Sequence, residues 1–106
     1  MIESVATLIL VGLLNAAPAE ATVPSNAGQQ MYEAVGCISC HGKHGNSPNE
    51  DYAPSLAGLD KEYIITQLLN FQNGELKNKT IMNAMAPMVE GYEEEVADYL
   101  SKQVPH

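Results

Sequence analysis

The run Cys37-Ile38-Ser39-Cys40-His41 carries the most specific chemistry in this chain. It is a C-x-x-C-H motif, the pattern at which a c-type haem is attached. Two thiols can add to the two vinyl groups on one edge of a porphyrin, and the two residues between them let the backbone turn so that the next imidazole lies under the iron. The motif therefore predicts one covalently bound haem c, held by Cys37 and Cys40, with His41 as the proximal iron ligand.

Paired cysteines at this spacing also occur in redox-active dithiols and in zinc sites. A thioredoxin-like dithiol needs a βαβ context, and no run in this chain alternates with the period of two that predicts strands. A structural zinc site usually draws on four Cys or His ligands, whereas the chain contains only two cysteines. The haem interpretation is favoured, and a simple dithiol or disulfide is the alternative.

The length and composition of the chain indicate a small domain whose core needs support. At 106 residues it is one domain, and without a leader it approaches the size at which a hydrophobic core becomes marginal. It has no tryptophan and one phenylalanine. A covalently held haem, which is a large flat apolar group, would replace the missing aromatic side chains.

The chain is acidic, with 13 aspartate and glutamate residues against 5 lysine and arginine residues and a formal charge of -8. This balance argues against nucleic acid and anionic membrane surfaces as partners. It favours a protein partner with a basic docking patch, although an acidic surface that only confers solubility explains the same charge.

Residues 1–21 have the features of a secretory signal peptide. An apolar run from Val5 to Leu14 precedes Ala19-Glu20-Ala21, which fits a cleavage site, but Glu3 stands where such signals usually have a positive residue. The alternative is a retained N-terminal anchor, whose apolar run is short of the about 20 residues that span a bilayer. We therefore expect export to the periplasm, with residues 22–106 forming a monohaem domain and with membrane contact only if the anchor is retained.

Apolar periodicity predicts three helices. The first spans residues 27–35, has Ser25 or Asn26 as its cap and ends at Gly36. Its buried face is expected to comprise Met31, Ala34 and Val35. The motif follows directly, and residues 42–49 are turn-rich and are expected to form a loop along one haem edge.

The second helix is predicted over residues 61–73, with Asp60 as its cap and Gly74 at its end. Residues 75–87 show no clear period and are expected to be mostly irregular. The last helix is predicted from Val89 or Glu90 to Gln103, with acidic residues in its first turn, where the helix dipole favours them. Its buried stripe is expected to comprise Tyr92, Val96, Tyr99 and Leu100. The predicted fold class is all-α.

The order of these parts resembles a class I cytochrome c, in particular the cytochrome c4 and c5-like bacterial branch. A helix, the C-x-x-C-H motif, a glycine-rich loop, Pro54-Ser55-Leu56-Ala57-Gly58, a second helix, a methionine-bearing loop and a terminal helix follow one another over residues 26–103. The resemblance implies three to four helices around one covalently attached haem. It also implies that the Pro54 carbonyl accepts a hydrogen bond from the His41 imidazole, which would orient the ring and raise its basicity.

The resemblance also concerns the sixth iron ligand, which is expected to be a methionine because a thioether favours ferrous iron and raises the reduction potential. Met82 lies near the family's ligand position. The segment Thr80-Ile81-Met82 is also similar to the ligand segment in the haem subunit of flavocytochrome c sulfide dehydrogenases. Met85 is the alternative, because residues 85–89 resemble a ligand segment of cytochrome c4. Met88 is the least favoured of the three.

Other conspicuous side chains receive structural interpretations. His44 is expected to be an exposed loop residue and His106 a terminal residue, and neither is assigned as an iron ligand. Tyr99 and Gly28 match the resembled family's crossing of the first and last helices. The other tyrosines are expected in the core or at the haem edge: Tyr32, Tyr52, Tyr63 and Tyr92.

Three functions are compatible with these features. The favoured one is a periplasmic electron carrier rather than an enzyme, with a six-coordinate His/Met haem that cycles between Fe(III) and Fe(II) and serves redox proteins such as a membrane oxidase or reductase. The second is the electron-accepting haem subunit of a flavin-containing dehydrogenase, such as a sulfide dehydrogenase, with a flavoprotein subunit as partner. The third is a ligand-binding or enzymatic haem protein with an open iron site. The chain has no G-x-G-x-x-G motif or phosphate-binding loop.

Overall fold

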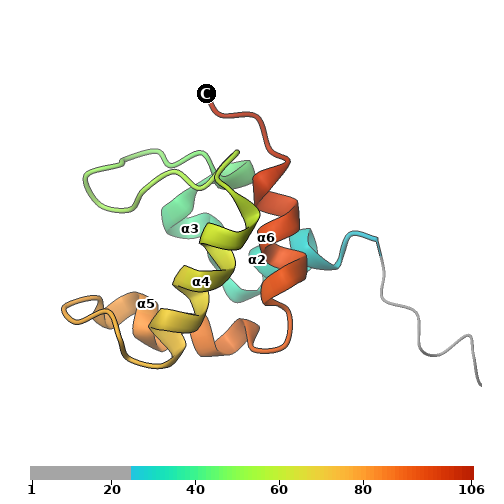
Figure 1. The fold of residues 1–106 in the computed structure, drawn as a ribbon. Coiled ribbons are helices and arrows are strands. Elements are labelled where there is room, and N and C mark those ends of the chain that lie inside the picture. Colours follow the sequence, from blue (N-terminus) through green and yellow to red (C-terminus); the bar gives the residue numbers. More distant parts are fainter. Residues whose placement is uncertain (1–24) are drawn as a thin grey trace, which may run out of the picture.

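The structure, a computed structural model, describes residues 25–106, and the signal peptide predicted over residues 1–21 lies outside this part of the chain. Residues 25–106 form five α-helices and two short 3-10 helices with no strand, which confirms the all-α prediction (Figure 1). In chain order they are α2 (Ala27–Val35), α3 (Ile38–His41), η2 (Lys43–Gly45), α4 (Lys61–Gln72), α5 (Thr80–Met85), η3 (Ala86–Val89) and α6 (Glu93–Ser101). None of these helices has the length and apolar character needed to cross a membrane.

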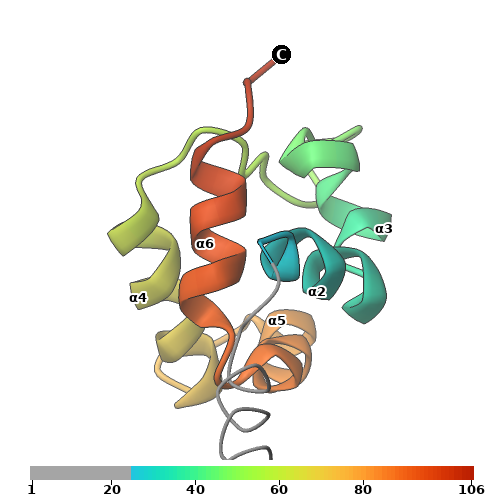
Figure 2. The ribbon, with the colours of Figure 1, turned by 90° about the vertical axis from the view of Figure 1, so that its right-hand side faces the viewer.

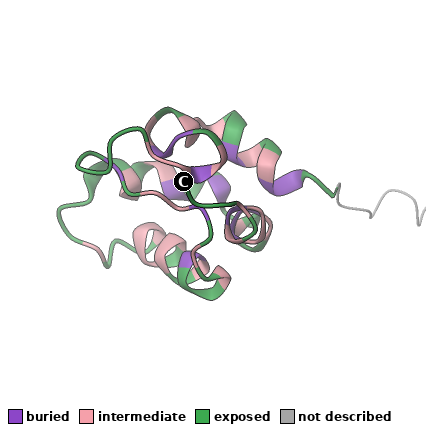
Figure 3. Ribbon diagram, turned by 90° about the horizontal axis from the view of Figure 1, so that it is seen from above, coloured by how far each residue is buried: buried purple, intermediate pink, exposed green. Residues whose placement is uncertain are grey.

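Helix α6 is the centre of the fold. It lies between α4 and α2 and contacts both (Figure 2). Its inner face supplies Val96, Ala97 and Leu100, each at most 3% exposed. The neighbouring elements complete the buried cluster with Tyr32, Ile64 and Val89. The buried segments lie on the inner sides of the helices, and the connecting loops are largely exposed (Figure 3). The polypeptide core is therefore confined to the helix contacts. A small core of this kind is expected for a chain of this length.

The crossing of α2 and α6 requires a glycine at position 28. A Cβ atom there would collide with the carbonyl oxygen of Glu95 and would lie 3.0 Å from the Cβ of Tyr99. The rings of Tyr32 and Tyr99 meet at the same crossing, with their centroids 5.8 Å apart. The helix crossing that the sequence predicted at Gly28 and Tyr99 is therefore present.

Gly28→Ala is expected to lower the free energy of unfolding by about 1–3 kcal/mol, because the added methyl group forces α2 away from the α6 backbone. Helix propensity alone predicts the opposite sign, since alanine is favoured over glycine inside a helix by about 1 kcal/mol. Denaturant unfolding of the haem-loaded protein measures the difference. Ala34→Gly, at an exposed position of the same helix, is the matched control for propensity. A gain in stability for Gly28→Ala would contradict the close packing.

Local signals located several helix ends correctly. Gly36 ends α2 with a φ of +96°. The Asp60 carboxylate caps α4 by accepting a hydrogen bond from the backbone N–H of Tyr63 at 3.0 Å. Helix α4 ends at Gln72, one residue before the predicted end. Asn26 occupies the N-cap position of α2, but its side chain makes no capping hydrogen bond.

The prediction that residues 75–87 are mostly irregular is wrong. Helix α5 occupies Thr80–Met85 and continues into η3 at Ala86–Val89. Both elements contact α4. A helix of six residues is too short to show a clear apolar period or to be stable alone, so tertiary packing stabilises it.

The last helix begins later than predicted. It starts at Glu93, not at residue 89 or 90, and it ends at Ser101. Gly91, with a φ of +89°, separates it from η3. The Glu93 carboxylate accepts a hydrogen bond from the Gly91 N–H at 3.0 Å, so the acidic first turn also stabilises the turn that precedes the helix.

The buried faces also differ from the prediction in part, with exposed fractions taken for the polypeptide alone. In α2, Ala34 is exposed and the buried residues are Ala27, Gly28 and Tyr32. In α6, Val96 and Leu100 are buried as predicted, whereas Tyr99 is only half-buried. Three of the other tyrosines are exposed in the polypeptide and so lie outside its core: Tyr52, Tyr63 and Tyr92. Only Tyr32 belongs to the core.

Candidate functional site

A one-turn helix directly after α2 brings the motif side chains together. The Cys37 N–H donates to the Tyr32 carbonyl at 3.1 Å, so α3 starts from a fixed point at the end of α2. The His41 N–H donates to the Cys37 carbonyl at 2.9 Å, which closes one helical turn. Residues three and four positions apart share a helix face, so Cys37, Cys40 and His41 lie on one side of this turn. Attachment through two thiols and ligation by the following imidazole require this arrangement.

The His41 imidazole is buried and held in one orientation. It is 7% exposed, and its Nδ1 lies 2.7 Å from the carbonyl oxygen of Pro54. A carbonyl oxygen can only accept a hydrogen bond. Nδ1 must therefore carry the proton, and Nε2 keeps its lone pair. The hydrogen bond selects the tautomer that can ligate a metal through Nε2 and raises the basicity of that nitrogen.

Ser47 holds the segment that contains Pro54. Its hydroxyl donates to the carbonyl of Ala53 at 2.6 Å, and its backbone N–H donates to the Ser55 hydroxyl at 2.9 Å. Ser47 thus binds the residues on both sides of Pro54. Sequence reasoning missed this residue, because its only signal was the turn-rich composition of residues 42–49.

Gly42, the residue after His41, connects the motif to α2 through a hydrogen bond. Gly42 has a φ of +85°, and a Cβ atom there would collide with the Asn46 carbonyl oxygen, so only glycine fits. The buried Tyr32 hydroxyl donates to the Gly42 carbonyl at 2.7 Å. Burial raises the pKa of the Tyr32 phenol, so the phenol stays protonated and remains a donor at neutral pH.

The Cys37 thiol differs from the reactive thiol of a redox-active dithiol. Both motif thiols are half-buried and free. Burial raises the pKa of the Cys37 thiol, and the nearby Cys40 adds to the rise while a backbone hydrogen bond opposes it. Reactive C-x-x-C pairs have a lowered thiol pKa instead. Within residues 25–106, no group of three or more His, Cys, Asp or Glu side chains is placed to hold a metal ion.

The expectation that His44 is an exposed loop residue is wrong. It is half-buried in η2, has a φ of +56°, and its Nδ1 lies 3.2 Å from the Tyr99 hydroxyl in α6. His106 is exposed, and its backbone N–H donates to the Asn46 side chain at 2.9 Å. Both contacts fasten the loop after the motif to the C-terminal part of the chain.

The three candidate distal methionines lie on α5 and η3. Met82 and Met85 are half-buried and three residues apart in α5, so they share one face of that helix. Met88 lies in η3 and is 58% exposed. Helices α3 and α5 lie on the same flank of the molecule, with α3 above α5 in both views (Figures 1 and 2). The methionines are thus on the side that carries the C-x-x-C-H motif.

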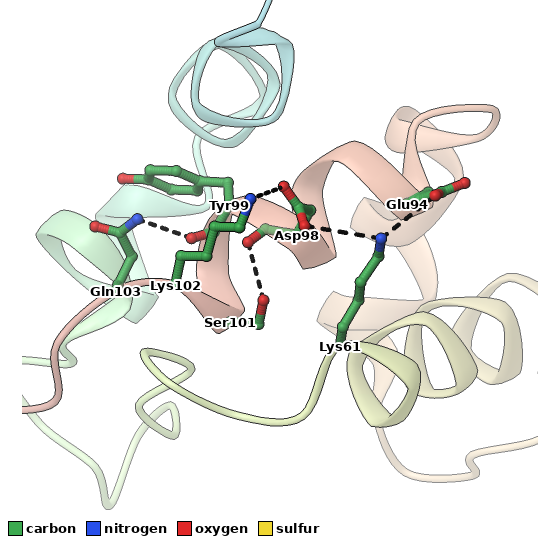
Figure 4. A network of polar contacts seen from close by, with 7 residues as sticks. All are labelled: Lys61, Glu94, Asp98, Tyr99, Ser101, Lys102 and Gln103. Carbon is green, nitrogen blue, oxygen red and sulfur yellow. Dashed lines mark hydrogen bonds and ion pairs between the residues drawn. The ribbon is translucent and has the colours of Figure 1, made fainter.

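A separate polar network joins α4 to α6 on the other side of α6 (Figures 2 and 4). Lys61 Nζ lies 3.3 Å from the Glu94 carboxylate and 3.7 Å from that of Asp98, which also pairs with Lys102 at 2.9 Å. The hydrogen bond to Glu94 raises the pKa of Lys61, and the hydrogen bond from Lys102 lowers the pKa of Asp98. Exposed pairs of this kind contribute little to stability.

Comparisons with known proteins agree on one family. The family model described as cytochrome c matches residues 25–102. Among curated proteins, the chain is 40% identical over 75 residues to a thiosulfate dehydrogenase electron acceptor of Thiomonas intermedia. It is 36% identical over 78 residues to the cytochrome subunit of sulfide dehydrogenase of Chlorobaculum tepidum, and 31% identical over 98 residues to cytochrome c4 of Pseudomonas aeruginosa.

These three matches cover 69%, 74% and 92% of this chain, but 34%, 66% and 43% of the respective relatives. The chain therefore spans between about a third and two thirds of the length of these relatives. The similarity concerns the domain that contains the motif, and the activity of each whole relative is a property of that longer protein.

Proposed function

The chain belongs to the cytochrome c family, and we propose that His41 and Met82 would ligate its haem iron. Members of this family hold haem c covalently and transfer electrons, and Cys37 and Cys40 have the spacing that attachment requires. When bound, haem c supplies a one-electron couple between ferric and ferrous iron. In this proposal the polypeptide would supply both protein ligands of the iron and would keep other ligands out.

The hydrogen bond from His41 Nδ1 to the Pro54 carbonyl is the observation that carries the proximal assignment. It leaves the Nε2 lone pair available, and it orients the ring within a buried environment. A ligand that is already oriented loses little freedom on binding, and its raised basicity stabilises the ferric state.

Two observations support Met82 as the distal ligand. It lies on α5, on the same flank as α3, and its position in the sequence is close to the family's ligand position. Its thioether is a soft donor that favours ferrous iron. Met85 is the alternative because it shares the α5 face with Met82, and Met88, which lies in η3 rather than in α5, is the least favoured of the three.

We expect electrons to pass through the haem edge beside Cys37 and Cys40. Cys37 and Cys40 would hold that edge, and the polypeptide encloses neither thiol completely. A partner that docks there needs only a small and transient interface. The formal charge of -8 favours a partner with a basic docking surface.

We infer that the protein works in the periplasm. The features of residues 1–21 are those of an export signal, and the relatives include bacterial cytochrome c4. N-terminal sequencing of the protein purified from the soluble periplasmic fraction is expected to start at residue 22. An uncleaved chain in the membrane fraction would support the anchored alternative.

A second function is supported by two relatives, a sulfide dehydrogenase cytochrome subunit and a thiosulfate dehydrogenase electron acceptor. In this alternative the chain is the haem subunit of a flavin-containing dehydrogenase and receives electrons inside a complex. Purification without a tag separates the two functions. A flavoprotein that stays bound through gel filtration supports the subunit, whereas a haem protein eluting alone supports a diffusing carrier.

Carbon monoxide tests whether the iron has two protein ligands. The reduced native protein is expected to bind carbon monoxide slowly or not at all, because both axial positions are filled. Its absorption spectrum should therefore show no rapid change after the gas is added. Rapid and complete binding would overturn the six-coordinate proposal and favour an open haem site that binds ligands.

A further inference from the structure

We propose that Ser47 is a positioning residue that sets the strength of the hydrogen bond between His41 and Pro54 and, through it, the reduction potential of the protein. The inference rests on the proposed ligation of iron by His41. Ser47 lies outside the C-x-x-C-H motif, and the hydrogen bonds that it makes within residues 46–60 support the proposal.

Ser47 uses both its hydroxyl and its backbone N–H in this loop. Its hydroxyl donates to the Ala53 carbonyl at 2.6 Å and accepts from the Asn49 N–H at 3.2 Å. Its backbone N–H donates to the Ser55 hydroxyl at 2.9 Å. The same hydroxyl oxygen lies 3.4 Å from the Cys40 carbonyl oxygen, so Ser47 is next to the C-x-x-C-H motif.

These bonds hold the residues on either side of the Pro54 carbonyl. Residues 46–60 contain no helix or strand, and Pro54 itself is exposed. The preceding peptide, between Ala53 and Pro54, has no N–H that could hold it, because residue 54 is a proline. The position of its carbonyl therefore depends on how Ala53 and Ser55 are held, and Ser47 holds both.

The hydrogen bond from Nδ1 controls how much electron density the imidazole gives to iron. A short bond to a fixed carbonyl gives the ring partial imidazolate character and raises its basicity. A more basic ligand stabilises ferric iron relative to ferrous iron and lowers the potential. Loosening the Pro54 carbonyl should therefore weaken the bond and raise the potential.

The test compares Ser47→Ala with Ser101→Ala in the haem-loaded protein. Ser101 is a matched control because it is also half-buried and its hydroxyl also donates to a backbone carbonyl, that of Asp98 at 2.9 Å. The first readout is the exchange rate of the His41 Nδ1 proton, followed by NMR in the diamagnetic ferrous state. The second is the reduction potential. Ser47→Thr, which keeps the hydroxyl, tests for rescue.

In Ser47→Ala the Nδ1 proton is expected to exchange roughly tenfold faster, as the loss of one ordinary hydrogen bond implies. The potential is expected to rise, Ser47→Thr to restore both values, and Ser101→Ala to change neither. If Ser47→Ala lowers only the unfolding free energy and leaves exchange and potential as in the wild type, Ser47 is merely structural and the inference is wrong.

One further variant and a spectrum of the wild-type protein complete the test. Should Ser47→Ala fail to accumulate, Ser55→Ala removes the other bond of Ser47 to this segment and should shift both readouts in the same direction. Failure of the axial-ligand proposal is recognised separately, since the wild-type spectrum would then lack the signature of a six-coordinate haem before any serine is changed.

Discussion

Replacing Met82 with alanine is expected to abolish the ferric charge-transfer band that marks methionine–iron ligation. The reduction potential should fall by roughly 0.1 V or more, a fraction of the about 0.8 V range that axial ligands span. The physical reason is that loss of the soft thioether removes the preferential stabilisation of ferrous iron. Absorption spectroscopy of the oxidised protein and a redox titration measure the two effects.

The controls are Met85→Ala and Met88→Ala. Both should keep the band, because methionines that do not bind iron only pack against their neighbours. Met85 is the stringent control, since it lies on the same face of α5 as Met82 and has similar burial. If Met85→Ala loses the band while Met82→Ala keeps it, Met85 is the distal ligand. Reduced Met82→Ala should also bind carbon monoxide rapidly, which the wild type should not.

Removal of both motif thiols, as Cys37→Ala with Cys40→Ala, is expected to reduce covalently retained haem from one per chain to none. Thioether bonds survive denaturation, whereas an axial ligand alone does not retain the porphyrin once the chain unfolds. Mass spectrometry of the denatured protein distinguishes the two states. Ser39→Ala is the matched control, because Ser39 lies between the two cysteines and is exposed. A haem-sized mass that persists on the double variant would contradict attachment at this motif.

The same double variant should be much less stable than the native protein. The buried cluster of the polypeptide consists of Tyr32, Ile64, Val89, Val96, Ala97 and Leu100, which is a small core for an independent domain. A porphyrin adds a large apolar surface to such a core, and a group that binds only the native state stabilises it. Circular dichroism during thermal unfolding should show a lower midpoint.

Features that depend on neighbouring residues could be predicted from the sequence. The end of α2 at Gly36 and the cap of α4 at Asp60 are decided by atoms within one or two turns of the chain. The C-x-x-C-H motif is equally local, because its spacing alone puts two thiols and an imidazole on one side of a turn. The start of α6 was misplaced because residues 86–89 form a short 3-10 helix of their own before Gly91.

The contact between His41 and Pro54 could be predicted from the family resemblance and from no local pattern. The two residues are 13 positions apart, and the bond was expected only because the order of motifs resembled a class I cytochrome c. Ser47, which holds that contact in place, carried no such signal. Its hydrogen bonds depend on the path of an irregular loop, and no periodicity describes that path.

The all-α class and the chemistry of attachment could be predicted from the amino acids alone, since helix signals and the cysteine spacing act over a few residues. Three features could not be predicted in this way: the existence of α5, the contact of His44 with Tyr99 across 55 positions, and the exposure of Tyr52 and Tyr63 in the polypeptide. The reason is that each depends on how α2, α4 and α6 pack together. Packing brings together residues that are far apart in the chain. The residue types alone do not predict which of these residues will be in contact.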